Sequence, residues 1–184
     1  PEYDTDLKKF MFIPSSDPFG FVGYPKWSSP WSEVYSPYYY DCKTGLFERR
    51  KATSPGPRPA CDTALFYSPK IKKAVYTVGD GAVFLYDHAA NTWTLAHGNA
   101  RTNLSISPFG VACYDTKRDQ IYTLSAQFKT DATQGRFLAK PNLLKIYDVG
   151  SNKWTDLETI GDAGEVGASH SAFCTYDSVN DVVL

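Results

Sequence analysis

Aromatic side chains that could bind a ligand are concentrated in one stretch near the N-terminus. Residues 14–33 read PSSDPFGFVGYPKWSSPWSE and carry Tyr24, Trp27 and Trp31 among prolines and glycines. Exposed rings of this kind stack on sugars or anchor a partner protein. We therefore take these three residues as candidate contacts. The alternative is a small satellite core in which the rings pack on one another and hold a long loop in place.

Three polar residues are further candidates for ligand binding. Arg136 lies in residues 126–142, AQFKTDATQGRFLAKPN, whose basic side chains could contact anionic groups; a solvated loop is the alternative. Arg58 and His170 each lie ahead of a β-rich run. Either could contact a ligand, or could form a structural hydrogen bond between neighbouring repeats.

Catalytic and metal chemistry have weaker support in the sequence. Asp87 and Asp148 stand at the start of tight turns, and capping of the turn by the carboxylate accounts for them better than calcium binding or catalysis. His88 follows Asp87 and is interpreted as a turn residue. The chain has no GxSxG, HExxH or P-loop motif. We predict no catalytic residue, no metal site and no cofactor.

The four cysteines do not indicate a regular disulfide framework. They form no CxxC pair and occupy different positions in the repeats described below. We interpret them as small buried apolar residues rather than as disulfides, although their disulfide state and the cellular compartment stay open. They are Cys42, Cys61, Cys113 and Cys174.

Charge and hydropathy limit the partners. The 184 residues include 19 basic and 20 acidic side chains and carry a net charge of −1, which provides no electrostatic footprint for nucleic acid or an anionic membrane. No apolar run reaches the roughly 18 residues of a membrane-spanning helix. We expect a protein or carbohydrate ligand, no nucleic acid and no membrane.

Two short repeats must position the candidate residues. Residues 83–95 read VFLYDHAANTWTL, a strand, a tight turn and a strand, and the pattern recurs at 144–157 and more faintly at 39–49. In each copy an aromatic-Asp pair is followed by a bulky aromatic residue seven positions after the tyrosine. A second repeat, YDTKRDQIYTL at 114–124, has relatives that begin at Tyr3, Tyr67 and Tyr176.

Together the two repeats predict consecutive four-stranded units. Most strand runs are apolar on both faces, which is typical of sheets packed between two neighbours. The first four-stranded repeat keeps a remnant of its first strand at Tyr3-Asp4, and the last repeat ends after two strands. The expected strands are 8–13, 34–41 and 46–51; then 61–67, 74–79, 82–88 and 92–96; then 111–115, 120–125, 143–149 and 153–157; and finally 171–177 and 181–184.

This pattern resembles the Kelch-repeat β-propeller, a family that includes the propeller domain of galactose-oxidase-like proteins. The resemblance rests on the spacing from Tyr86 to Trp93 and from Tyr147 to Trp154, and on the strands AVYTVG and QIYTL. Arg58 stands where Kelch blades often have the arginine of Arg-x-x-His, and His170 matches that histidine. The glycine doublet of the family is only hinted at by Gly79-Asp80-Gly81.

The resemblance implies an all-β fold, a Kelch-type β-propeller of four-stranded antiparallel blades. About three blades are expected, with incomplete first and last blades, so that 1–184 is a single partial propeller. Its open blade edges make self-association possible. The expected parts are a blade 1 remnant at 1–52, blade 2 at 58–97, blade 3 at 109–158 and the start of blade 4 at 168–184.

The functional expectation follows from the topology of such blades. Both insertions, 14–33 and 126–142, join second to third strands, and they fall on the same face as the long connections between blades. Loops on a rigid scaffold commonly carry binding sites. We expect a non-catalytic recognition or scaffold module that binds protein or carbohydrate through that face. The alternative is a fragment of a galactose-oxidase-like or other propeller enzyme whose catalytic residues lie largely outside this chain.

Overall fold

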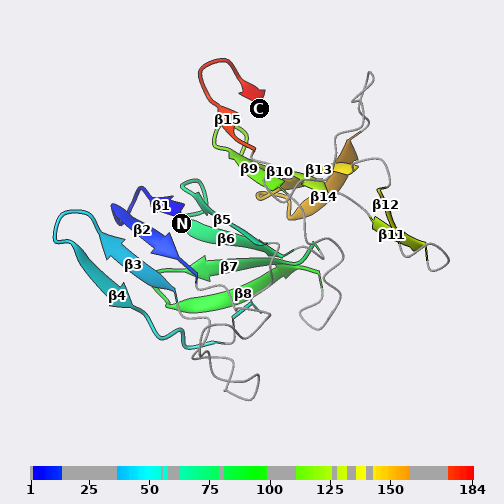
Figure 1. The fold of residues 1–184 in the computed structure, drawn as a ribbon. Coiled ribbons are helices and arrows are strands. Elements are labelled where there is room, and N and C mark those ends of the chain that lie inside the picture. The colour runs from blue at the N-terminus through cyan, green and yellow to red at the C-terminus, as the bar shows by residue number, and fades with distance from the viewer. Residues whose placement is uncertain are drawn as a thin grey trace. The chain divides into compact units, whose positions relative to one another are not determined.

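The computed structural model describes strands and their turns in two compact units, Pro1–Asn103 and Leu104–Leu184 (Figure 1). Within the described ranges no residue is helical, so none of them belongs to a helix that could cross a membrane. The described residues are 2–13, 37–54, 56–57, 63–78, 81–98, 111–125, 128–131, 136–139, 143–157 and 174–184.

The first unit contains two four-stranded antiparallel sheets whose strands follow one another in chain order. Figure 1 shows the two sheets side by side, and their first strands, β1 and β5, are in contact. The first sheet comprises β1 (Glu2–Asp4), β2 (Lys9–Phe12), β3 (Tyr38–Asp41) and β4 (Leu46–Arg49). The second comprises β5 (Thr63–Ser68), β6 (Lys73–Val78), β7 (Val83–Asp87) and β8 (Thr92–His97).

The second unit contains one four-stranded antiparallel sheet and two hairpins. One hairpin is inserted between the second and third strands of the sheet, and the other follows the sheet along the chain. The sheet comprises β9 (Val111–Asp115), β10 (Gln120–Ser125), β13 (Leu143–Asp148) and β14 (Lys153–Leu157). The hairpins are β11 (Phe128–Asp131) with β12 (Arg136–Ala139), and β15 (Tyr176–Asp177) with β16 (Val182–Val183).

The all-β class and the four-strand order expected from the sequence are confirmed, and most strand ends agree within two residues. Two expectations were wrong. The expected remnant at Tyr3-Asp4 is a paired strand, because Glu2 to Asp4 lie opposite Met11 to Lys9, so the first sheet has all four strands. The second insertion was expected to be a loop, but it contains the β11–β12 hairpin.

One turn design recurs in the three four-stranded sheets and in the β15–β16 hairpin. Seven described hairpins have a four-residue turn whose last residue has a positive φ. In six of them the Asp before the turn accepts backbone N–H bonds at its Oδ1, as Asp87 does from Ala89 at 3.0 Å and Ala90 at 2.9 Å. Capping therefore explains Asp87 and Asp148, as expected. The seven positive-φ residues are Lys8, Gly45, Lys72, Asn91, Asp119, Asn152 and Asp181.

The tyrosine of the Tyr-Asp pair reinforces the same turn. Its hydroxyl donates to the side chain five residues later, as Tyr86 does to Asn91 and Tyr176 to Asp181 at 2.7 Å. The positive-φ position favours Asn and Asp, which tolerate the left-handed region. One side chain thus meets both demands, backbone conformation and hydrogen bonding.

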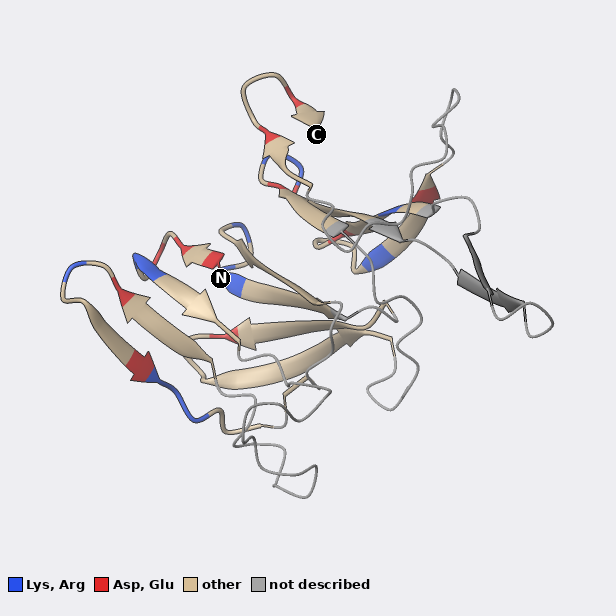
Figure 2. Ribbon diagram, in the orientation of Figure 1, with Lys and Arg blue, Asp and Glu red and all other residues tan. Residues whose placement is uncertain are grey.

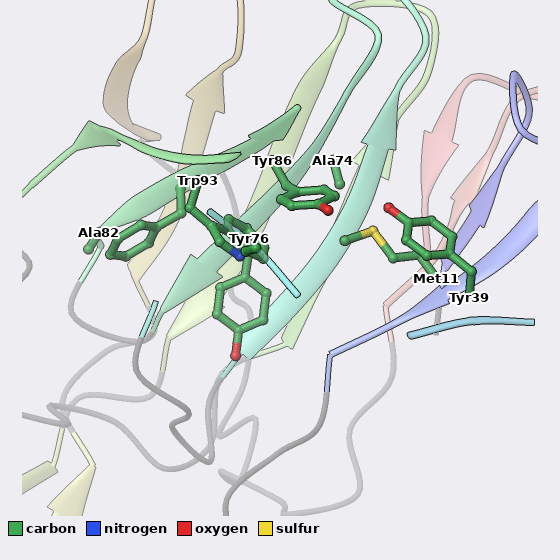
Figure 3. Packing of buried hydrophobic residues seen from close by; sticks show 9 residues of the cluster. Met11, Tyr39, Ala74, Tyr76, Ala82, Tyr86 and Trp93 are labelled. Atoms are coloured by element: carbon green, nitrogen blue, oxygen red, sulfur yellow. The ribbon is translucent and has the colours of Figure 1, made fainter. Parts of the chain in front are cut away.

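The hydrophobic core of the first unit is shared by its two sheets. Met11 and Tyr39 of the first sheet belong to the same buried cluster as Tyr86 and Trp93 of the second (Figure 3). The ring centroids of Tyr86 and Trp93 lie 4.9 Å apart. The second sheet carries charge only at the turn-side strand ends Lys73 and Asp87, which pair at 3.4 Å (Figure 2). Its strand centres are uncharged, as a buried sheet requires.

Substitution of Lys72 by Gly should stabilise the protein by about 0.5–1 kcal/mol. Lys72 has φ +55°, where a side chain with a Cβ is strained and glycine is not. The free energy of unfolding from urea titration measures the gain. The matched control is Lys70→Gly in the same turn, because Lys70 has no positive φ. It should not stabilise, and equal effects of the two changes would contradict this explanation.

Candidate functional site

Most of the residues predicted to bind ligand lie outside the described residues: Tyr24, Trp27, Trp31, Arg58 and His170. Arg136 is the exception. It begins β12, opposite Asp131 on β11, and its backbone alone is described. These contact assignments stay predictions.

The structure does fix the strands from which the candidate segments depart. In each four-stranded sheet the capped turns lie at one end, so the connection between the second and third strands leaves from the other end. Phe12 pairs with Tyr38 at the base of the segment that carries Tyr24, Trp27 and Trp31. Ser125 pairs with Leu143 at the base of the segment that carries Arg136. We call this end of each sheet the loop end.

A buried polar cluster joins the two sheets of the first unit. It consists of Asp4 at the end of β1, Tyr39 on β3 and His88 in the turn after β7. His88 Nε2 lies 2.8 Å from Asp4 Oδ2, and the Tyr39 hydroxyl contacts His88 Nδ1. The exposed fractions are 1% for Asp4, 0% for Tyr39 and 9% for the His88 side chain. We call these three residues the seam cluster.

The chemistry of the seam cluster defines the state of its histidine. Burial lowers the pKa of His88, with the nearby Asp4 carboxylate opposing that shift, so the ring is neutral at pH 7. A carboxylate oxygen accepts but does not donate, so the proton belongs on Nε2. Nδ1 is then the acceptor for the Tyr39 O–H. The Nε2–Oδ2 pair is a close electrostatic contact that falls short of good hydrogen-bond alignment.

Residues of the first sheet and of the segment after β4 also hold the members of the cluster. Asp4 Oδ1 caps its turn by accepting from Asp6 N and Leu7 N, both at 2.9 Å. Arg50 donates to the His88 carbonyl at 3.1 Å, and its guanidinium lies 5.0 Å from the Tyr39 ring centroid. Burial raises the pKa of Tyr39 far above its ordinary value, so the phenol stays protonated.

The chain after β4 adds further hydrogen bonds between the two sheets, because it runs beside the start of β8. We call this contact, together with the seam cluster, the seam. Asn91 Nδ2 donates to the Lys51 carbonyl at 2.6 Å, and Thr53 N donates to the Asn91 carbonyl at 2.9 Å. Ser54 Oγ accepts from Trp93 N at 2.6 Å. Trp93 is 4% exposed, whereas Phe47 at the equivalent repeat position is 67% exposed. Trp93 is thus a buried packing residue, while Phe47 packs on Tyr40 and stays exposed.

The seam cluster has the side chains of a proton relay but not the access that catalysis requires. A catalytic group must reach the atoms of a substrate, and all three side chains are enclosed between the two sheets. Its role is to join the sheets. The interpretation of His88 as a turn residue was therefore incomplete, because the residue lies in the turn but its ring is buried against the neighbouring sheet.

A second polar cluster links two turns in the second unit. Arg118 donates to Asp115 Oδ2 at 2.7 Å. It also binds Asp181 in a bidentate manner, with bonds of 2.6 and 2.7 Å to the two carboxylate oxygens. Hydrogen bonds from Arg118 and Tyr176 lower the pKa of Asp181. Arg118 and Asp181 are partly exposed to solvent, whereas Asp115 is buried, and each of the three groups is paired with its neighbours. The cluster fastens the β15–β16 turn to the β9–β10 turn.

Metal ligation and known relatives add no further site. No group of three or more His, Cys, Asp or Glu side chains within the described part of the chain could hold a metal ion. No protein-family model matches the chain, and no curated protein matches it. The described residues form an all-β fold with three four-stranded antiparallel sheets and seven turns of one design.

Exchange of His88 for Gln should reduce the pH dependence of stability between about pH 6.5 and 5. The ordinary pKa of histidine is 6.5, and burial lowers it in the folded state, so the unfolded chain takes up the proton first as the pH falls. Stability then decreases by at most about 1.4 kcal/mol per pH unit. Capping carboxylates such as Asp87, whose pKa is lowered by the Ala90 N–H, lose their contribution only below about pH 4.

Urea unfolding at pH 7.5, 6.5 and 5.5 measures that slope. The matched control is His97→Gln, which removes a histidine on β8 outside the seam cluster and should keep the wild-type slope. A wild-type protein with no slope in this window, or a His88→Gln variant with an unchanged slope, would show that His88 is not held neutral at the seam.

Exchange of Asn91 for Asp should destabilise the first unit by about 1–2 kcal/mol. The new carboxylate keeps an acceptor for Tyr86, as Asp119 does for Tyr114, but it places an oxygen against the Lys51 carbonyl and loses the donor. Equilibrium unfolding followed by tryptophan fluorescence reports the loss. A variant as stable as the wild type would mean that the Asn91–Lys51 bond does not strengthen the seam.

Proposed function

We propose that the chain is part of a Kelch-type β-propeller and acts as a non-catalytic recognition module that binds protein or carbohydrate at the loop end of its sheets. Residues Tyr24, Trp27, Trp31, Arg58, Arg136 and His170 are the proposed contacts. The observation that carries the proposal is the division of each sheet into two unlike ends.

The turn end of the sheets is chemically self-contained. Its carboxylates accept from their own backbone, and its tyrosine hydroxyls donate to the last turn residue. The loop end bears both long insertions and the connections between sheets. A rigid strand framework that carries variable loops at one end is the usual arrangement for recognition. The aromatic content of residues 14–33 suits stacking on sugars or anchoring of a protein chain.

The Kelch-type assignment has support from repeat geometry. Each four-stranded sheet has an up-and-down order, and the Tyr–Trp pair recurs with similar ring separations, 4.9 Å for Tyr86–Trp93 and 5.1 Å for Tyr147–Trp154. In the first unit, successive sheets pack through a shared core. Propellers are built from four-stranded sheets that follow one another along the chain and pack face to face.

Replacement of Trp27 and Trp31 together by Ala should weaken ligand binding by at least about tenfold, since each lost ring contact costs on the order of 1 kcal/mol. Tryptophan fluorescence titration with neutral oligosaccharides tests the carbohydrate arm, and a displayed peptide library tests the protein arm. The control is Leu46→Ala, an exposed apolar residue at the turn end, which should bind as the wild type does.

The outcomes separate the proposal from its alternative. Unchanged binding by a correctly folded Trp27→Ala/Trp31→Ala variant would contradict the assignment of the loop end. Retention of copper by the purified protein, together with the absorption of a tyrosyl radical, would favour the propeller-enzyme alternative instead.

A further inference from the structure

Two cysteine side chains meet in the second unit. Cys113 lies on β9 and is buried, and Cys174 lies two residues ahead of β15 and is partly exposed. Both are free thiols, their elements are in contact, and the interaction between the two side chains shifts the pKa of each. The expectation of small buried residues thus holds for Cys113, while Cys42 is exposed and Cys61 lies outside the described residues.

The meeting of the two thiols is supported by contacts along the same elements. β15 contacts β9, and Arg118 after β9 forks onto Asp181 after β15. Thr175 exchanges two backbone hydrogen bonds with Leu184, at 3.0 and 2.9 Å, which extends the hairpin pairing to the residue next to Cys174. The ion pair fixes the turn of the hairpin, and the thiol pair lies near its open end. The hairpin is therefore held beside β9 at two separate points.

We propose that Cys113 and Cys174 form an intrachain disulfide that fixes the β15–β16 hairpin to β9. The oxidant is a small-molecule disulfide of the glutathione type. One protein thiolate attacks it, forms a mixed disulfide and releases one small thiol. The second protein thiolate then attacks the protein sulfur of the mixed disulfide, so that the intrachain S–S bond forms and the second small thiol leaves. Two protein thiols are oxidised and one small disulfide is reduced, so hydrogen atoms and electrons balance.

The environments of the two thiols give the order of attack. The hydrogen bond from Cys113 lowers the pKa of Cys174 and, together with burial, raises that of Cys113. The thiolate is the nucleophile in exchange, and reagent access matters as well. Cys174 is both the more acidic and the more exposed thiol, so it reacts first with the small disulfide. Cys113 then resolves the mixed disulfide from within the fold.

The test is oxidation of the complete chain with oxidised glutathione, followed by alkylation of remaining thiols and peptide mapping by mass spectrometry. The expected product is one peptide pair linked through Cys113 and Cys174, in the variant Cys42→Ser as in the wild type. In Cys113→Ser, the expected product is a glutathione adduct that persists at Cys174. Links from either residue to Cys42 or Cys61, or recovery of both thiols as alkylated, would overturn the proposal.

Amide hydrogen exchange provides a second readout that does not depend on a mutation. Oxidation should slow exchange in β15 and β16 of the wild-type chain, because opening of the hairpin away from β9 is then restrained by a covalent bond. Cys113→Ser/Cys174→Ser should show no such slowing under the same treatment. A disulfide that forms without a change in exchange of the hairpin would overturn the claim that it fixes the hairpin to β9.

Discussion

The structure depends on a carboxylate that closes a four-residue turn. An Asp at the end of a strand accepts the backbone N–H groups of the turn, and the last turn residue takes a left-handed conformation. Both features are local, so each hairpin is specified by its own short sequence. A tyrosine one residue before the Asp adds a bond to the last turn residue in four of the turns. Hairpins built in this way can be repeated along a chain and arranged in antiparallel sheets.

Asp4 takes part both in a capped turn and in the packing of one sheet on the next. One of its oxygens caps a turn of the first sheet, and the other faces His88 of the second. A buried carboxylate needs compensation, because an unpaired charge in the interior is costly. His88 and the capped amides supply that compensation together. Such a buried polar pair contributes little net stability, which the shared apolar core supplies instead.

The sequence was most informative where a local rule decides the outcome. The strands of the second and third sheets were predicted within two residues, because Asp, Asn and Tyr at fixed spacing define the turn at one end of most of these strands. The interpretation of His88 as a turn residue missed the seam cluster for a related reason. His88 and Val149 occupy the same turn position, with 9% of the His88 side chain and 7% of Val149 exposed, but among the described residues only His88 meets a carboxylate of a neighbouring sheet.

Equivalent repeat positions also differ in burial for reasons that the local sequence does not contain. Trp93 is covered because residues 51–54 run beside it, and Phe47 has no described segment over its face. A repeat pattern predicts which side chains face outward from a sheet, but the neighbour that covers them is a long-range property. The turn pattern also makes no prediction for the candidate contacts in residues 14–33, because this segment contains no copy of the repeat.

The central claim is that the first two sheets form one cooperative unit through the seam and the shared core. Native-state amide hydrogen exchange across a series of low urea concentrations tests it most directly. The account predicts that the slowest amides of β2 and β3 and those of β6 and β7 exchange with the same free energy of opening and the same urea dependence. Exchange of β2 and β3 through a smaller, urea-independent opening while β6 and β7 remain protected would contradict it.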